Sequence, residues 1–224
     1  MKRAKKLYPR RVRALRMAAI ALALMLFCNG VLHIGFLLPI QLLRVCEQYE
    51  GVYERTRVVQ RRCELGMMHL LDALYLTEGE NTLSLFCANP SVYGWIDGFV
   101  WPVDTSDGGD VHAGVVGMSH RGREDVLVFY GRVNGTEDVE LTANVCTERR
   151  PDAEHSETVH VYGHGIGKAD CFVRDGYTYF IFIEPYPVPE EARRERLTGY
   201  QLIVNRGEEH IEYEIEQTAG VFWG

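Results

Sequence analysis

Aromatic and acidic residues stand close together near the middle of the chain, where they could bind a ligand. The aromatic residues are Tyr93, Trp95, Phe99 and Trp101, and the loop that follows contains Asp104, Asp107 and Asp110. Rigid aromatic rings and carboxylates on adjoining loops suit a peptide, a sugar or a cation. The candidate ligand-binding surface is therefore made of Tyr93, Trp95, Trp101, Asp104 and Asp107. For the aromatic residues taken alone, a place in the hydrophobic core is the favoured interpretation.

The same loop offers three carboxylates to a metal ion. Calcium prefers hard oxygen ligands, but the calcium loop of helix–loop–helix proteins places its acids at every second position, which this loop does not. Aspartate and glycine are also the residues that ordinary turns use. We expect no metal and no other cofactor, with Asp104, Asp107 and Asp110 as the alternative metal site.

Three further residues are candidates for catalysis, namely Ser119, His120 and Cys146. Nucleophilic catalysis needs a nucleophile held beside a base. Residues 117–122 (GMSHRG) approach the G-x-S-x-G nucleophile elbow but are one residue too long. We expect no catalytic site. The alternative is a cell-surface hydrolase or transpeptidase in which His120 serves Cys146 or Ser119.

Two fragments around these residues resemble sortases, the transpeptidases of Gram-positive surfaces. Residues 119–121 (SHR) are similar to the histidine segment of that family, and residues 141–147 (LTANVCT) to its cysteine segment. The resemblance implies a β-barrel with a Cys–His–Arg site behind a single membrane anchor. The Thr-Leu-x-Thr-Cys signature of sortases is absent, and the separation between histidine and cysteine is far shorter. We do not adopt this assignment.

Disulfide formation and N-glycosylation both depend on the cellular compartment, so the cysteines and one asparagine are considered together. Five cysteines follow Cys28, an odd number, so they cannot form a complete set of intrachain disulfides. We expect mainly buried free thiols, and the sequence leaves the state of Cys87, Cys146 and Cys171 open. Asn134-Gly135-Thr136 is an N-glycosylation acceptor in a predicted hairpin turn. It would carry a glycan only in a eukaryotic or viral chain.

The charge of the 224-residue chain is divided sharply. Residues 1–44 carry nine Lys or Arg and no acid, and the rest holds 15 basic residues against 31 acidic ones. A part with a net charge of −16 is poorly suited to nucleic acid, because phosphate binding needs a cationic face. An apolar content of 46% also excludes a disordered chain.

The N-terminus has the pattern of a membrane anchor. A basic tail over residues 1–16 precedes an uncharged apolar run over residues 17–43. We predict a transmembrane helix in this run, in contact with the lipid bilayer, with the N-terminus in the cytoplasm and the acidic part outside. A cleaved signal peptide is the alternative, although no small-x-small site follows the apolar centre.

Residues 44–78 are apolar at helical spacing, which predicts an amphipathic juxtamembrane helix. Such a helix would pack on its own domain or, as the alternative, form a homodimer through residues 45–76.

After residue 79 the period changes to two, and turn signals recur every 8–12 residues. This pattern predicts a mainly β domain over residues 79–224, an antiparallel β-sandwich or an open barrel. The expected strands are 82–88, 112–118, 125–133, 139–146, 158–163, 169–174, 177–184, 197–205 and 210–217.

The sequence thus predicts a single-pass membrane protein whose acidic β domain lies outside the membrane. We expect this domain to be a binding, sensing or interaction module for a protein, peptide or glycan. A structural subunit of a membrane complex is a further alternative, because a sandwich alone specifies no function.

Overall fold

The computed structural model describes residues 9–31, 36, 38–64, 72–91, 94–118, 126–136, 139–149, 159–185 and 195–215. The described residues form two α-helices, one short 3-10 helix and twelve strands. They are α1 (Arg10–Gly30), α2 (Pro39–Tyr49), β1 (Arg57–Glu64), β2 (Asp72–Glu78), β3 (Thr82–Ser91), β4 (Gly94–Asp104), β5 (Val111–Met118), β6 (Val126–Asn134), β7 (Val139–Arg149), β8 (Val159–Ile166), η1 (Lys168–Asp170), β9 (Cys171–Arg174), β10 (Tyr177–Pro185), β11 (Glu195–Arg206) and β12 (Glu209–Ile215).

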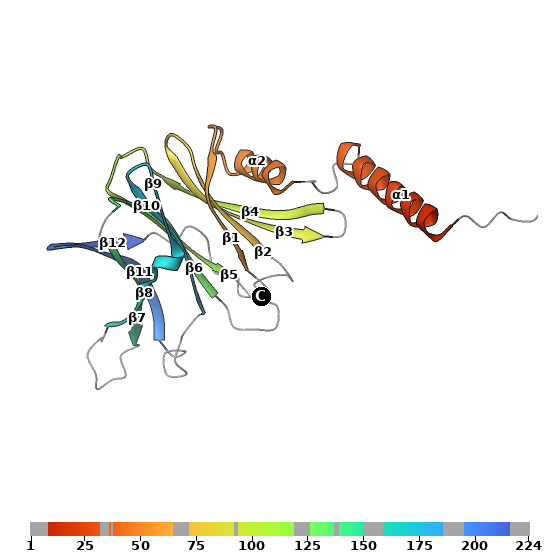
Figure 1. Cartoon of the computed structure of the whole chain (residues 1–224). Helices are drawn as coiled ribbons and strands as arrows, with labels where there is room; N and C mark the ends of the chain where they lie inside the picture. The colour runs from red at the N-terminus through yellow and green to blue at the C-terminus, as the bar shows by residue number, and fades with distance from the viewer. Residues whose placement is uncertain are drawn as a thin grey trace, which may run out of the picture.

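The described strands form three antiparallel sheets of four strands each (Figure 1). Sheet A has the order β1-β2-β3-β4, sheet B the order β5-β6-β10-β9, and sheet C the order β12-β11-β7-β8. The mainly β, antiparallel class expected from the sequence is therefore confirmed. All nine expected strands are present, with ends shifted by a few residues.

Sheet B is the middle layer of the β-rich part. One hydrophobic cluster joins it to sheet C and a second joins it to sheet A. Strand β10 contributes to both, because Phe180 packs toward sheet C while Tyr179 and Ile181 pack toward sheet A. Strand β10 is thus a central strand, because both of its faces are covered.

A third cluster lies between α2 and the outer face of sheet A. Leu42 and Leu43 from α2 are 4% and 1% exposed and pack with Tyr75, Phe86 and Val100. The layers therefore run α2, sheet A, sheet B, sheet C. This arrangement has one sheet more than the two-layer sandwich expected from residues 79–224. The expected strand at 82–88 is part of β3, which forms sheet A with β1 and β2 before that range and with β4, which was not expected.

The helix predicted for residues 44–78 is wrong beyond Tyr49. The chain turns at Gly51, whose φ of +79° suits glycine, and then forms β1 and β2. Leu74 and Leu76 face sheet B, and Ala73 and Tyr75 face α2. A strand covered on both faces has no polar face, so its continuous apolar run also matches the apolar spacing of a helix. Because residues 57–64 and 72–78 are strands, they offer no helical surface for the predicted homodimer.

The apolar run over residues 17–43 is not one helix. Helix α1 ends at Gly30, and the last part of the run belongs to α2, where Leu42 and Leu43 are buried against sheet A. Among the described residues, no helix is both long enough and apolar enough to cross a membrane. Figure 1 shows α1 apart from the sheets, beyond α2 and the ends of β3 and β4.

Candidate functional site

The predicted aromatic surface falls mainly on β4, the edge strand of sheet A. Strand β4 pairs with β3 along its length, but the register shifts where Asn89 pairs with Asp97 and Pro90 with Trp95. Ile96 is therefore an extra residue on β4, which makes a β-bulge. Because side chains alternate between the faces of a strand, one extra residue moves everything before it to the other face.

The bulge separates the two tryptophans. Trp95 packs against the α2 side of sheet A, whereas Trp101 packs against the cluster between sheets A and B. Trp101 also stacks on Phe99, with ring centroids 6.0 Å apart and planes 21° apart, and Phe99 is 49% exposed. Tyr93 lies outside the described residues. The structure thus brings Phe99 and Trp101 together and places Trp95 elsewhere.

The loop between β4 and β5 uses its aspartates to stabilise its own turns. The Asp104 carboxylate accepts a hydrogen bond from the Ser106 N–H at 2.9 Å, and Asp107 accepts one from the Gly109 N–H at 3.0 Å. These bonds hold the pKa of both carboxyls below the ordinary value. Such Asx turns are a common use of aspartate and need no metal.

Asp107 has a second partner at the start of β5. Its Oδ1 lies 2.7 Å from Nε2 of His112, whose side chain is buried at 2% exposure. Asp110 instead accepts a hydrogen bond from the Asn134 side chain at 3.1 Å. The described residues contain no group of three acids, histidines or cysteines arranged to hold a metal ion.

Of the catalytic candidates, the structure describes Cys146, while Ser119 and His120 lie outside the described residues. Cys146 lies on β7 opposite Gly199 of β11, next to a bulge at Thr198. A cavity of about 350 Å³ opens there, and its lining includes Cys146, Gln201 and Glu214. Burial, with a smaller effect of Glu214, raises the pKa of the Cys146 thiol and so disfavours the nucleophilic thiolate.

The six cysteines are all free, and they range from buried Cys87 to exposed Cys63. Asn134 ends β6 and is exposed, Gly135 is partly buried, and Thr136 is exposed. The glycosylation acceptor therefore lies where an enzyme could reach it.

A charged cluster between sheets A and B was not foreseen from the sequence. Glu78, at the end of β2, is 6% exposed. Its Oε1 accepts hydrogen bonds from Tyr179 Oη at 2.8 Å and from Arg132 Nη1 at 2.6 Å. Its Oε2 accepts one from Arg57 Nη2 at 2.9 Å, and that same nitrogen donates to Asp175 at 2.8 Å. We call these five residues the Glu78 cluster.

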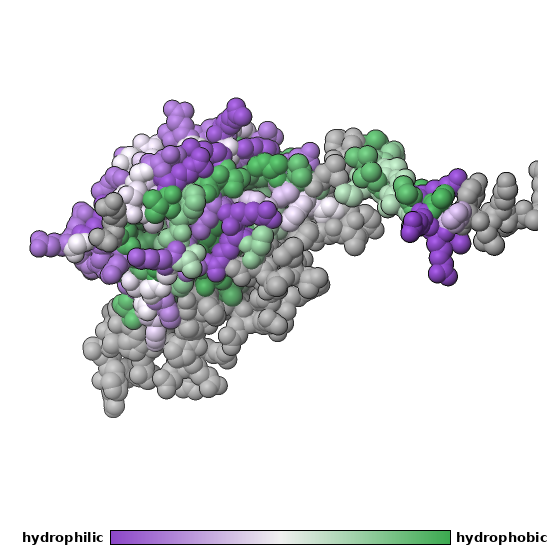
Figure 2. All heavy atoms as spheres, in the orientation of Figure 1, coloured by the Kyte–Doolittle hydropathy of each residue, from purple (hydrophilic) through white to green (hydrophobic). Residues whose placement is uncertain are grey.

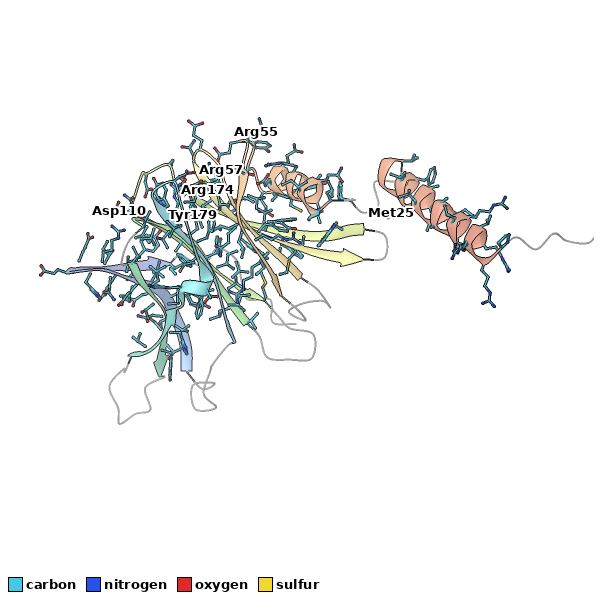
Figure 3. All side chains as sticks on the ribbon, in the orientation of Figure 1. Met25, Arg55, Arg57, Asp110, Arg174 and Tyr179 are labelled. Atoms are coloured by element: carbon cyan, nitrogen blue, oxygen red, sulfur yellow. The ribbon has the colours of Figure 1, made fainter. Side chains whose placement is uncertain are left out.

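The cluster joins four strands of sheets A and B at one end, and Glu78 itself belongs to β2. Arg57 comes from β1, Arg132 from β6 and Tyr179 from β10. The guanidinium of Arg132 also lies 4.8 Å from the ring centroid of Tyr177, a cation–π contact. Figure 3 shows Arg57 and Tyr179 close together at this end, with Arg174 of β9 beside them.

Burial alone would raise the pKa of Glu78. The hydrogen bonds from Tyr179, Arg57 and Arg132 more than offset this effect, so the pKa of Glu78 lies below its ordinary value. Burial and the Glu78 carboxylate together raise the pKa of Tyr179. The carboxylate is therefore ionised and the phenol protonated at neutral pH, which suits a structural role. A carboxylate directly after an apolar strand was the only sequence signal for this cluster.

Comparison with protein families, with curated proteins and with solved structures finds no match to this chain.

Proposed function

We propose that this protein is held at a membrane by α1 and that its β-rich part acts outside the cytoplasm as a binding module. The observation that carries the proposal is the exposure of apolar side chains on α1. Seven of them are 50–72% exposed, and they are distributed around the helix: Leu15, Met17, Ile20, Leu22, Leu24, Leu26 and Phe27. From Met17 to Cys28 the helix is apolar all round, and a helix surface of this kind needs an apolar environment.

The charges of α1 support a bilayer as that environment. Its first two turns contain Arg10, Arg11, Arg13 and Arg16, and no acid is present in the helix. Figure 2 shows this end of α1 as hydrophilic and the opposite end as hydrophobic. At 1.5 Å per residue the 21 residues of α1 extend about 31 Å, of which the uncharged part from Met17 to Gly30 extends about 21 Å. Arginine side chains at the end of a span can reach the headgroups, and cytoplasmic flanks are enriched in basic residues.

The binding role is supported by the surface of β4 and the loop after it. Phe99 and Trp101 form a partly exposed aromatic stack on an edge strand. The exposed Asp104 and Asp107 follow on a loop that is ordered by its own hydrogen bonds. A preorganised loop beside aromatic rings can bind a partner at a low entropic cost. A peptide or glycan is the proposed class of ligand.

Two other functions, an enzyme that uses Cys146 and a structural subunit of a membrane complex, have less support. A hydrolase or transpeptidase at Cys146 would need a thiolate, and burial favours the thiol. A structural subunit would need an apolar docking face, and the exposed Phe172 and Val173 on β9 point to opposite faces of that strand.

Flotation of the full-length protein with phosphatidylcholine–phosphatidylserine liposomes tests the anchor. We expect Ile20→Asp combined with Leu24→Asp to abolish flotation, because each aspartate at the centre of a span costs about 2.5–3.5 kcal/mol. The matched control is Phe172→Asp with Val173→Asp, which adds the same charges at exposed apolar positions of β9. Flotation of both variants, or of neither, would contradict the anchor.

Proximity labelling on cells tests the binding role. Phe99→Ser combined with Asp104→Asn should remove extracellular proteins labelled by the wild-type protein. Phe172→Ser serves as the control, because Phe172 is exposed to a similar extent at 42%. An unchanged set of labelled proteins with the first variant would refute a role for this surface.

A further inference from the structure

Between α1 and α2, the described residue Phe36 forms a β-bridge with Trp95 at the edge of sheet A. The Phe36 N–H donates to the Trp95 carbonyl oxygen at 2.7 Å, and the Trp95 N–H donates to the Phe36 carbonyl oxygen at 2.8 Å. Gly94 allows this close approach. Its φ is +113°, and a Cβ there would lie 2.4 Å from the Phe36 carbonyl oxygen.

The bridge limits how far the β-rich part can lie from the end of α1. The C-cap of α1 is Val31, five residues before Phe36. A fully extended chain covers at most about 3.6 Å per residue, so the end of α1 lies within about 18 Å of Phe36. Trp95 is hydrogen-bonded to Phe36 through the backbone, so it is also held near the C-terminal end of α1.

We propose that this end of sheet A rests on the outer membrane surface, with Trp95, Leu38 and Ile40 contacting the lipid headgroups. The inference rests on the proposed function, because it takes α1 as the membrane span. The basic N-terminal end of α1 faces the cytoplasm, so its C-terminal end reaches the outer surface. Leu38 and Ile40, at the start of α2, are 57% and 37% exposed.

The chemistry of these side chains fits the membrane interface. Tryptophan is enriched there, because its ring is apolar and its N–H can bond to headgroups or water. Trp95 is partly exposed and, like Phe36, packs against the cluster between α2 and sheet A. Its position therefore makes it an interfacial anchor that sets the orientation of sheet A.

Trp101 provides an internal contrast. It lies six residues farther along β4, about 20 Å at the usual rise of a strand. The bulge at Ile96 also places it on the opposite face of sheet A. We expect Trp101 to lie away from the lipid.

Quenching of tryptophan fluorescence by brominated phosphatidylcholine tests this orientation in the full-length protein. The chain has three tryptophans, Trp95, Trp101 and Trp223. The double variant Trp101→Phe with Trp223→Phe leaves Trp95 as the single tryptophan, and Trp95→Phe with Trp223→Phe leaves Trp101. We expect at least twofold stronger quenching for Trp95 than for Trp101 when the bromines lie near the headgroups. Flotation of each variant is measured on the same liposomes.

The outcomes distinguish a failure of the proposed anchor α1 from a failure of the proposed orientation of sheet A. If the variants fail to float, the proposed anchor fails. If they float and Trp95 is quenched no more than Trp101, the anchor stands and the proposed orientation is wrong. Gly94→Ala provides a second test, because it should break the bridge to Phe36 and reduce the quenching of Trp95 without preventing flotation. Unchanged quenching in that variant would show that the bridge does not set the orientation.

Discussion

Replacing Glu78 by Gln should be among the most damaging single changes in the β-rich part. Glu78 is 6% exposed and receives hydrogen bonds from Arg57, Arg132 and Tyr179. Glutamine keeps the shape but removes the charge. The Arg132 side chain, only 11% exposed, would then be buried without its counter-charge. Breaking a buried ion pair on one side costs about 3–5 kcal/mol, so we expect a loss of that size.

Two further variants show how much of this loss of stability comes from the contacts of Glu78. Tyr179→Phe removes one hydrogen bond to a charged group and should cost about 1.5–3 kcal/mol. Glu212→Gln is the matched control, because Glu212 is 63% exposed and pairs with the exposed His210. An exposed pair of this kind contributes at most about 1 kcal/mol. Urea unfolding followed by circular dichroism in detergent measures all three. A Glu78→Gln variant no less stable than Glu212→Gln would refute a stabilising role for the cluster.

The same carboxylate predicts how stability depends on pH. Because the folded state lowers the pKa of Glu78, the unfolded chain binds the proton more readily. The contribution of Glu78 is thus fully present above its unfolded pKa of about 4.3 and is lost as the pH falls through the lower folded pKa. We expect the wild-type protein to lose stability more steeply than Glu78→Gln below about pH 4.3. Parallel acid-unfolding curves would contradict this reasoning.

Three further predictions concern packing, topology and thiols. Gly131→Ala should destabilise the fold by about 1–3 kcal/mol through overpacking, since a Cβ there would lie 2.5 Å from the His112 carbonyl oxygen. Gly165→Ala, where nothing lies within 4 Å, is the control and should be nearly neutral in thermal melts. In mammalian cells a glycosidase-sensitive mobility shift should be lost in Asn134→Gln, and absence of any shift in the wild-type protein would contradict the outside location. Because all six cysteines are free, dithiothreitol should leave the melting temperature unchanged, and a large decrease would reveal a disulfide.

The strands of sheets B and C could be predicted because their sequence patterns and turns agree. In β7, Leu141, Ala143 and Val145 alternate with polar residues and all three face the core with sheet B. The turn at Asp175-Gly176 joins β9 to β10 with positive φ at both residues, as a two-residue hairpin requires. Local signals were sufficient in this part of the chain.

Sheet A was harder to predict because α2 and sheet B cover its two faces. In β2, Leu74 and Leu76 pack on one side and Ala73 and Tyr75 on the other, which leaves a continuous apolar run. Such a run has no period of two, and short apolar runs are ambiguous between strand and helix. The bulge at Ile96 is a second example, because the residues before and after it give no local sign that Trp95 and Trp101 face opposite ways.

The Glu78 cluster shows why its members could not be grouped from the sequence. Glu78 and Tyr179 are 101 residues apart, and Arg132 is 54 residues from Glu78. Each side chain taken alone suits a solvent-exposed strand end. Their proximity follows from the stacking of sheet A on sheet B, which no local pattern encodes. Sheet A also carries the bridge from Trp95 to Phe36. The cluster therefore lies on the connection between the part of the domain joined to α1 and the two sheets beyond it, and weakening it should loosen that connection before it disturbs the core between sheets B and C.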